Sequence, residues 1–398
     1  MMGSVNQVTI GNATAMQAYD VIVVGLGTVG SATCMQLGRR GLSVLGLDAF
    51  HPPHGRGSHH GRSRSIRRAY LEGSAYVPMA LRAWELWRRL EQDSAATLLT
   101  TTGNLTIGPP DGPAVKGFLN SARAYDIPHE CLEAAEVRKR WPQLHLPDSL
   151  AAGLELQAGV IFPESAITAL LGQAEKAGAT LRFDEPISSW SVQGDRVKVR
   201  THRTLYEAGR LLLAAGARNK SLIGPMGDWL LPKRVPVHWV SPPEDQNFKL
   251  GAYPVNFWQL PLPGPLKPSP YTEFYSLPVT CVGGRVKVAP HNHLADCDPE
   301  SPLDDNFSSD LARIRELLSQ YIPSLAARDI KSDVCMYALT PDGEFALGPL
   351  AGYDNVLCAS LAGHGFKFAP VLGEVMADML TETKPEFDVT MFSPGRFE

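Results

Sequence analysis

The sequence predicts a mixed α/β protein of two domains, and three observations lead to this prediction. A strand, a glycine-rich turn, a helix and a second strand follow one another from Tyr19 to Asp48, as in a parallel nucleotide-binding unit. The segment from about 235 to 288 is rich in proline, aromatic residues and short β-type runs, which is typical of an antiparallel sheet. The length of 398 residues allows two or three domains at roughly 150 residues each.

Charge and cysteine content exclude several classes of protein. Lys and Arg total 37 and Asp and Glu total 41, so the formal net charge is −4 and we expect neither nucleic acid nor a membrane surface as a partner. The six cysteines form no CxxC pair, which predicts reduced thiols in the cytoplasm and no metal site. The uncharged start of the chain predicts a flexible leader over residues 1–18.

The first motif is a GxGxxG turn formed by Gly25, Gly27 and Gly30, and Asp48 follows the last glycine by 18 residues. The glycines let the backbone approach a pyrophosphate at the positive end of a helix expected from about Thr28 to Arg40, and the acid would take ribose hydroxyls. The stretch 21–38 is also long and uncharged enough to resemble a membrane span, but its glycines and polar residues favour the nucleotide site. A tight turn that binds nothing remains the alternative.

A basic loop follows directly, with four His, five Arg and four Gly within residues 49–73. A solvated loop or a nucleic-acid patch would have the same composition. Because the loop begins after the ribose-binding strand, it would lie beside the nucleotide, where its charge would meet phosphate or a substrate anion.

Hydrophobic periodicity predicts the remaining elements. In chain order they are a helix over 76–91, a strand over 105–108, helices near 117–125 and 134–140, a strand over 159–162, a helix over 165–177, strands over 180–183, 197–201 and 210–216, a helix over 311–321, a strand containing Cys335, strands over 345–348 and 356–360, and a helix over 369–380. Gly363, His364 and Gly365 precede the last helix, whose N-terminus would attract a negative group.

Four motifs in order resemble one family: GLGTVG (25–30), SHHGRSRSIRRAY (58–70), VCMYALT (334–340) and GHGFKF (363–368). Together they are similar to the monomeric sarcosine oxidases and N-methyltryptophan oxidases. The resemblance implies a two-domain FAD oxidoreductase. Its Rossmann-like FAD-binding domain would comprise residues 19–100, 158–233 and 342–398, and its antiparallel-sheet substrate domain residues 101–157 and 234–341.

The activity that the resemblance implies is oxidation of a secondary amino acid with O2. A hydride would pass from the carbon next to nitrogen to FAD, giving an imine, and reoxidation by O2 would give hydrogen peroxide. Sarcosine, a bulkier N-methyl amino acid and a cyclic amino acid such as proline or pipecolate all remain open as substrates. The family also leads us to expect a monomer.

The resemblance assigns roles residue by residue. Cys335 matches a cysteine linked through its sulfur to the flavin 8α methyl, and Lys287 matches a lysine that promotes the reaction with oxygen. Arg67 and Lys367 match two cations that hold the substrate carboxylate. The other matched residues are His60, Arg64 and His291 as basic groups of the active site, Tyr275 and Tyr337 as aromatic walls, and Gly25, Gly27, Gly30, Asp48, Ser58, His59, Gly363, Gly365, Phe366 and Lys367 as further contacts of FAD.

Each assignment has a structural alternative. Cys335 could be a buried strand thiol, Lys367 a lysine extended along a helix start, and Lys287 part of a solvated sheet face. Trp258 is assigned to core packing rather than to the site. Arg62, Ser65 and Ala338 depart from the family pattern, and the match before Lys287 requires a one-residue gap.

Three other functions remain open from the sequence. They are a flavin dehydrogenase that uses another electron acceptor, a nicotinamide-dependent enzyme, and a non-catalytic flavin-binding sensor.

Overall fold

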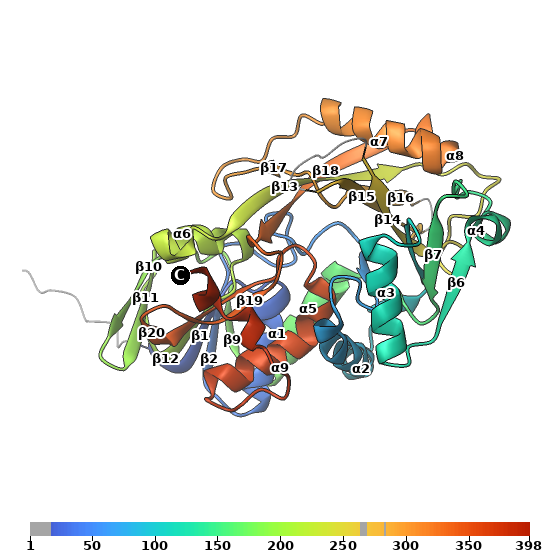
Figure 1. The fold of residues 1–398 in the computed structure, drawn as a ribbon. Coiled ribbons are helices and arrows are strands. Elements are labelled where there is room, and N and C mark those ends of the chain that lie inside the picture. Colours follow the sequence, from blue (N-terminus) through green and yellow to red (C-terminus); the bar gives the residue numbers. More distant parts are fainter. Residues whose placement is uncertain (1–16, 263–268, 282–283) are drawn as a thin grey trace, which may run out of the picture.

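Two large sheets and one small sheet organise the fold (Figure 1). The computed structural model describes residues 17–262, 269–281 and 284–398. Most of the predicted leader lies outside the described residues. Gln17 and Ala18 already belong to the first strand, so the leader was predicted to end two residues too late.

The first sheet has eight strands, and its parallel centre forms around β1 (Gln17–Val24). β1 pairs in parallel with β2 on one side and with β12 on the other, as the two apolar runs around the glycine turn predict. β20 pairs with the end of β12, so the C-terminal segment returns to the nucleotide-binding sheet. The other strands are β2 (Val44–Leu47), β9 (Thr180–Arg182), β10 (Ile187–Gln193), β11 (Arg196–Thr201), β12 (Leu205–Leu213), β19 (Ala346–Leu350) and β20 (Tyr353–Ser360).

Strand β10 was not predicted from the sequence. It forms an antiparallel hairpin with β11 at the sheet edge, and its ISSWSVQ side chains are exposed or half-buried. A solvated edge strand therefore lacks the apolar run on which the prediction depended.

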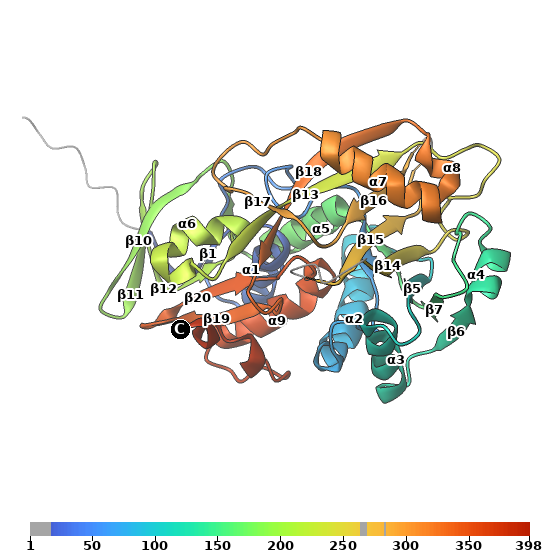
Figure 2. The ribbon, with the colours of Figure 1, turned by 45° about the horizontal axis from the view of Figure 1, so that its top comes forward.

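Four helices pack together beside this sheet (Figures 1 and 2). α1 (Thr28–Arg39) lies between α5 (Pro163–Lys176) and α9 (Ala369–Leu380), and α2 (Val77–Ser94) packs against α5 and α9. One apolar core joins these helices to the sheet. The packing fixes the N-terminus of α1 and the segment before α9 on the same side of the cavity described below.

The second sheet has nine strands, and its pairings are antiparallel except for the parallel pair of β14 with β5. α7 (Ser308–Tyr321) and α8 (Pro323–Ala326) contribute to a core on one face, where Trp258 stacks on Phe274. The assignment of Trp258 to core packing is therefore correct. The strands are β5 (Asn104–Gly108), β6 (His129–Glu133), β7 (Ala151–Glu155), β13 (Leu231–Val240), β14 (Val255–Pro261), β15 (Tyr271–Leu277), β16 (Val286–Pro290), β17 (Ala295–Asp296) and β18 (Ile330–Leu339).

The remaining elements are a small sheet and three helices outside the groups described above. A small sheet joins β3 (Arg64–Ile66), β8 (Gly159–Ile161) and β4 (Leu99–Thr101). The other helices are α3 (Pro113–Ala124), α4 (Ala134–Arg140) and α6 (Asn219–Ile223). Within residues 17–262, 269–281 and 284–398, no helix has the length and apolar character needed to cross a membrane. The predicted division into two discontinuous domains stays a prediction.

Candidate active site

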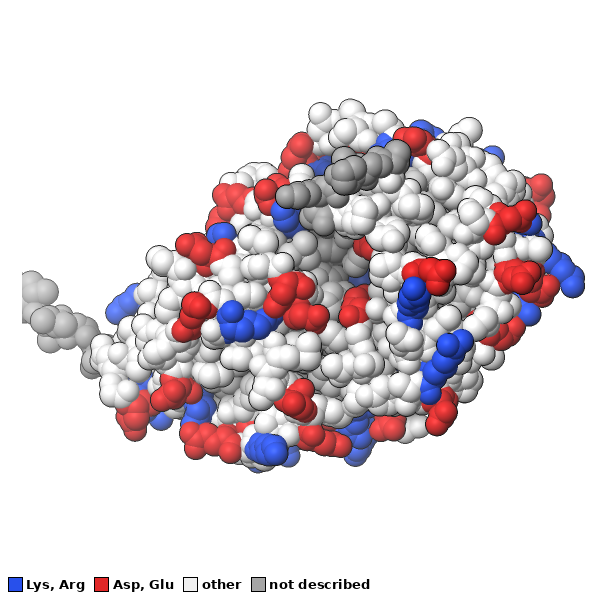
Figure 3. Space-filling view, viewed as in Figure 1, with Lys and Arg blue, Asp and Glu red and all other residues white. Residues whose placement is uncertain are grey.

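A cavity of about 650 Å³ receives walls from both large sheets. The space-filling view shows a hollow near the centre of the molecule (Figure 3). The ends of β1, β2 and β12 line one part of it, and β14, β15 and β18 line another. The basic loop and the segment 359–367 complete the walls.

The glycine turn lies at the end of the cavity formed by β1 and β2. Gly25 has a φ of +89°, and a Cβ atom on Gly30 would lie 1.8 Å from the carbonyl oxygen of Gly25. Asp48 accepts hydrogen bonds from Leu26 N at 2.7 Å and Phe50 N at 2.9 Å. The predicted ribose-binding acid therefore also holds the turn in shape.

Much of the second half of the basic loop lies inside the protein, whereas His51, Arg56 and Arg62 are exposed. His59, His60, Arg67 and Arg68 are all buried, so the alternative of a solvated loop is wrong for this part of the segment. Burial, followed by the charge of His54, lowers the pKa of His59 to about 3. His59 Nε2 accepts a hydrogen bond from His54 N, which leaves the proton of the neutral ring on Nδ1, beside Gly27.

His60, Lys287 and Cys335 lie directly behind the cavity wall, near Arg64, which is part of that wall. Arg64 donates to the carbonyl oxygens of Ser63 and His60, and its Nη2 lies 3.9 Å from the Cys335 sulfur. Lys287 is only 2% exposed and donates to the carbonyls of Gly61 at 3.0 Å and Ser63 at 2.9 Å. The alternative of a solvated sheet face for Lys287 is therefore wrong.

The thiol of Cys335 has an unusual environment for a buried cysteine. Burial raises its pKa, but a hydrogen bond with His60 and the charges of Arg64 and Lys287 outweigh burial and bring the pKa down to about 7. The other two buried thiols, Cys34 and Cys358, behave differently, because burial alone acts on them and raises the pKa of both. The pKa of Cys358 is raised to about 12. Cys335 is therefore the buried cysteine with the greatest thiolate character.

Arg67 and Lys367 come together although the chain separates them widely. Both lie close to the ring of Tyr70, with Arg67 Cζ at 5.2 Å and Lys367 Nζ at 5.0 Å from its centroid. Lys367 Nζ donates to the carbonyl of His364 at 2.7 Å and is 6% exposed, so the alternative of a lysine extended into solvent is wrong. The two cations thus lie next to each other on the cavity wall, as the resemblance predicts.

A carboxylate that the sequence analysis did not consider joins this pair. Glu72 Oε1 accepts a hydrogen bond from Arg67 Nη2 at 2.6 Å. Burial raises the pKa of Glu72, but the charges of Arg67, His364 and Lys367 bring it to about 2, so Glu72 stays ionised. Burial, followed by repulsion from Arg67, lowers the pKa of Lys367 to about 7.

Aromatic rings surround His291 in the same region. Its ring centroid lies 5.6 Å from that of Phe257 and 5.9 Å from that of Tyr337, and Tyr275 lies at 6.4 Å. Burial lowers the pKa of His291, so its ring is neutral at pH 7. The predicted aromatic walls therefore meet at one place, and Phe257 belongs to them as well.

The glycines before α9 make room for these rings. Gly363 has a φ of +81°, and a Cβ atom there would lie 2.6 Å from Tyr337 Cδ2. A short 3-10 turn, Phe366–Phe368, separates these glycines from α9, which begins at Ala369 as predicted. Phe366 and Lys367 are part of this turn and line the cavity.

The structure thus brings most predicted site residues to one cavity. Arg64, Arg67, Tyr275, His291, Tyr337 and Lys367 line it, whereas Gly30, His60, Lys287 and Cys335 lie behind the lining. Sequence analysis missed Tyr70, Glu72 and Phe257. Glu72 did leave a signal, because it is the only acid in the basic loop over residues 49–73.

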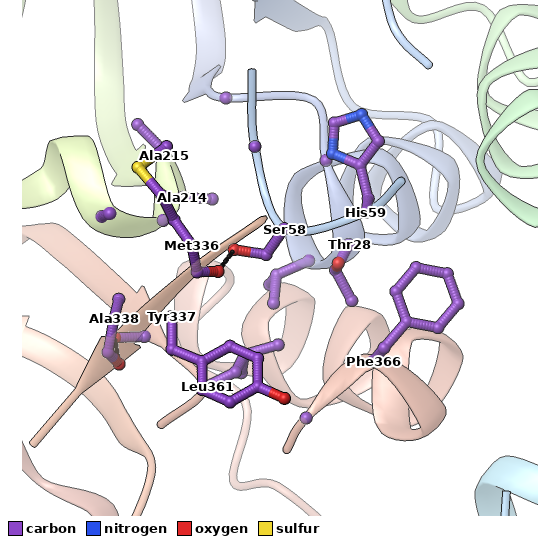
Figure 4. A pocket seen from close by; sticks show the side chains of 18 of the residues that line it. Thr28, Ser58, His59, Ala214, Ala215, Met336, Tyr337, Ala338, Leu361 and Phe366 are labelled. Atoms are coloured by element: carbon purple, nitrogen blue, oxygen red, sulfur yellow. Dashed lines mark hydrogen bonds between the residues drawn. The ribbon is translucent and has the colours of Figure 1, made fainter. Parts of the chain in front are cut away.

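The cavity fits FAD in shape and chemistry. Figure 4 shows the small side chains of Ala214, Ala215 and Ala338 around it, with His59 and Phe366 on another side. Figure 4 also shows the hydrogen bond from Ser58 Oγ to the Met336 carbonyl, which ties the basic loop to β18 at 2.5 Å. The glycine turn and His59 Nδ1 would hold the pyrophosphate, and the wall near Tyr337 would meet the flavin ring.

Comparison with known proteins identifies the class to which this site belongs. The model of the family described as FAD dependent oxidoreductase, DAO, matches residues 20–379. The fold and the nucleotide end of the cavity therefore define an FAD-dependent oxidoreductase, which replaces the nicotinamide-dependent alternative.

Curated relatives narrow this class. The chain is 35% identical over 384 residues to the monomeric sarcosine oxidase of Streptomyces avermitilis, covering 95% of this chain and 97% of that protein. It is 33% identical over 382 residues to the N-methyl-L-tryptophan oxidase of Citrobacter koseri, covering 95% and 99%. The chain belongs to the family that contains these monomeric sarcosine oxidases and N-methyl-L-tryptophan oxidases. The predicted family and type of enzyme, an FAD-dependent oxidase, are confirmed.

Solved structures confirm the predicted fold class. The open form of NikD, an unusual amino acid oxidase essential for nikkomycin biosynthesis, matches with a TM-score of 0.80 at 25% identity, covering 95% of this chain and 98% of that one. L-proline dehydrogenase from P. horikoshii also matches with a TM-score of 0.80, at 22% identity, covering 96% and 98%. The second match shows the fold alone.

Proposed function

We propose that the protein oxidises the CH–NH bond of a secondary amino acid, such as sarcosine, another N-methyl amino acid or a cyclic amino acid. The observation that carries this proposal is the convergence of Arg67 and Lys367 on Tyr70 at the cavity wall. Arg67 and Lys367 are two buried cations, and Glu72 is the carboxylate that pairs with Arg67. One positive charge is therefore left to bind a substrate carboxylate. FAD, when bound, would take up the hydride and pass the two electrons to O2, giving an imine and hydrogen peroxide.

The residues around the clamp would orient the amine. Phe257, Tyr275 and Tyr337 enclose the space beside the clamp and exclude water from it. His291 is neutral within this cage, so it adds no positive charge to repel an amine. The amine nitrogen and its neighbouring carbon would thus be held on the apolar side of the clamp.

Lys287 would serve the oxygen step. Two carbonyls hold the Lys287 amino group in place, and burial, followed by the charge of Arg64, sets its pKa well below the usual lysine value. The reaction of O2 develops negative charge beside the flavin, which would favour the protonated amino group and be stabilised by it. Arg64 lies between Lys287 and the cavity and would share this role.

We further propose that FAD is linked covalently through Cys335. The support is the pKa of about 7 for this thiol, because a thiolate is the nucleophile that a sulfur link to the 8α methyl requires. The link would replace one C–H bond of that methyl group by a C–S bond, with the proton lost to solvent. The two electrons would pass to the flavin and from it to O2, as in the proposed reaction. Protein precipitated with acid should retain the yellow colour, and Cys335→Ala should release all flavin to the supernatant. Cys358→Ala is the matched control, since Cys358 is equally buried but has a pKa near 12. Free flavin from the wild-type protein would contradict the linkage.

A substrate panel tests the proposed activity. We expect peroxide release and bleaching of the flavin absorbance with N-methyl or cyclic amino acids, and much less with amines that lack a carboxylate. Bleaching without peroxide, and with reduction of an added dye, would indicate a dehydrogenase instead. No bleaching with any member of the panel would favour a flavin-binding sensor.

A monomeric state and a cytoplasmic location stay predictions. Gel filtration would test the first, and cell fractionation would test the second.

A further inference from the structure

Asn104 is a buried polar residue that has no part in the proposed reaction. It is 0% exposed, lies at the first position of β5 and lines the cavity. Its Oδ1 accepts a hydrogen bond from Ser65 Oγ at 3.3 Å. Its Nδ2 has no hydrogen-bond partner among the described residues.

The unpartnered donor of Asn104 differs in character from the cavity-lining residues next to it in the second sheet. In the second sheet, Asn104 lies in register with Val255 of β14, and the next strands carry Leu277 and Lys287 in the same row. The following row holds Phe257 and Tyr275, which form the aromatic wall. Asn104 therefore adds one amide to a stretch of wall whose nearest cavity-lining neighbours in the sheet are apolar.

A buried donor of this kind discriminates between ligands. Water in the cavity can satisfy Nδ2 while no ligand is bound, but a substrate that fills the cavity displaces that water. A substrate that offers an oxygen acceptor restores the hydrogen bond, whereas an apolar substrate of the same shape leaves the amide unpaired. Sites that hydrogen-bond a substrate in this way reject the analogue without the polar group far more strongly than apolar pockets reject an extra methylene.

We infer that Asn104 is a specificity residue and that the substrate side chain carries an oxygen acceptor, such as a carbonyl, opposite Nδ2. This inference rests on the proposed function, because it assumes that Arg67 and Lys367 hold the carboxylate of the same molecule. It narrows the open choice of substrate. Sarcosine and proline carry no such side-chain oxygen, so both should be poorer substrates than an N-methyl amino acid with a side-chain carbonyl.

Two matched substrate pairs test the inference in the holoenzyme. N-methyl-L-asparagine and N-methyl-L-leucine have side chains of nearly the same shape, and N-methyl-L-glutamine and N-methyl-L-methionine extend the comparison to a longer side chain. We expect kcat/KM for the carbonyl member of at least one pair to exceed that of its apolar partner by roughly tenfold or more. Wild-type protein that treats both members of both pairs alike, or prefers the apolar members, would overturn the inference without any mutation.

Variants then assign the preference to Asn104. Asn104→Leu keeps the size of the side chain but removes the donor, so the preference should disappear or reverse. Thr272→Val is the control, because Thr272 is buried in β15 of the same sheet, its hydroxyl accepts a hydrogen bond from Arg313 of α7, and it does not line the cavity. If Asn104→Leu lowers kcat/KM for both members by the same factor, Asn104 supports the fold or the flavin and the inference is wrong.

A binding measurement separates this inference from the proposed function. Succinamate and 4-methylpentanoate are carboxylates without an amine, and only the first has a carbonyl on its side chain. Their dissociation constants, from the change in flavin absorbance, should differ in wild-type protein and converge in Asn104→Leu. If no amino acid bleaches the flavin but this difference appears, the proposed reaction fails while Asn104 keeps its assigned role. Equal dissociation constants in wild-type protein would count against Asn104.

Discussion

The two ends of the cavity are built in different ways. At the nucleotide end, Gly25, Gly30 and Asp48 lie within one β-α-β unit, and the backbone of the turn would do most of the binding. At the clamp end, Arg67 and Lys367 lie 300 positions apart and meet on Tyr70. The nucleotide end therefore depends on backbone shape, whereas the clamp end depends on buried charges that balance one another. Substitutions at the nucleotide end should therefore reduce flavin binding, and substitutions at the clamp end should reduce substrate recognition.

The largest effect on bound flavin is expected at the nucleotide end. A methyl group in Gly30→Ala would overlap the Gly25 carbonyl at 1.8 Å, and relieving this overlap must move the turn that receives the pyrophosphate. Forced overpacking costs about 1–3 kcal/mol or more, so we expect at least a tenfold loss of bound flavin in purified protein. Gly172→Ala on α5 is the control, because a Cβ atom there meets open space. Full flavin content in Gly30→Ala would show that the shape of this turn does not limit cofactor binding.

At the clamp end, substitution should spare the flavin and damage substrate recognition. Arg67→Ala leaves Glu72 buried without its partner and removes one of the two cations, which should cost about 2–5 kcal/mol in kcat/KM for an amino acid. An amine without a carboxylate should lose much less. Arg140→Ala on α4 provides the control, since Arg140 is 36% exposed and forms only surface ion pairs. Equal losses for both kinds of substrate would assign Arg67 to the fold rather than to the clamp.

The same contrast explains how far the sequence could predict this molecule. The turn around Gly25 and the helices over 134–140 and 369–380 were predictable because local periodicity and glycine spacing define them. The family resemblance carried by the motifs also predicted that Arg67 and Lys367 bind the same carboxylate. Neither the local patterns nor the resemblance pointed to Glu72 or Asn104. The importance of these two residues depends on the hydrogen-bond partners that they have or lack. Such information depends on contacts across the sheets, which no local pattern records.

The variant Lys287→Met tests whether the region behind Arg64 takes part in reoxidation of the flavin by O2 rather than in oxidation of the amine. Lys287→Met removes a buried amino group that the Gly61 and Ser63 carbonyls hold, and should slow reoxidation of the flavin by O2 by roughly 3 kcal/mol, about a hundredfold. Anaerobic bleaching by the amino acid should stay within about tenfold of normal, because the clamp is intact. Lys331→Met is the control, since Lys331 is exposed on β18. Stopped-flow measurement of both half-reactions checks this, and unchanged reoxidation would remove Lys287 from the oxygen step.

The smallest expected effect is a pH dependence of the clamp. Burial and the nearby Arg67 lower the pKa of Lys367 to about 7, so raising the pH from 6 to 8.5 removes the proton from most molecules. A carboxylate ligand binds the protonated form better, which raises the pKa of Lys367 in the complex. Affinity should therefore be full below pH 7 and fall by up to about tenfold for each pH unit above it, until the weaker binding of the neutral form takes over.

The amine of a substrate would also titrate with pH, so the measurement uses 4-methylpentanoate, a carboxylate without an amine. Its dissociation constant then reports the titration of the lysine. His364 does not interfere, because burial lowers its pKa to about 4, and burial also moves the pKa of His291 downwards. Lys367→Arg keeps a charge that does not titrate in this range and should give a flat profile, whereas Lys367→Met should give weak binding at every pH. A wild-type profile that stays flat to pH 9 would show that Lys367 remains charged, and the clamp would then act as two permanent cations.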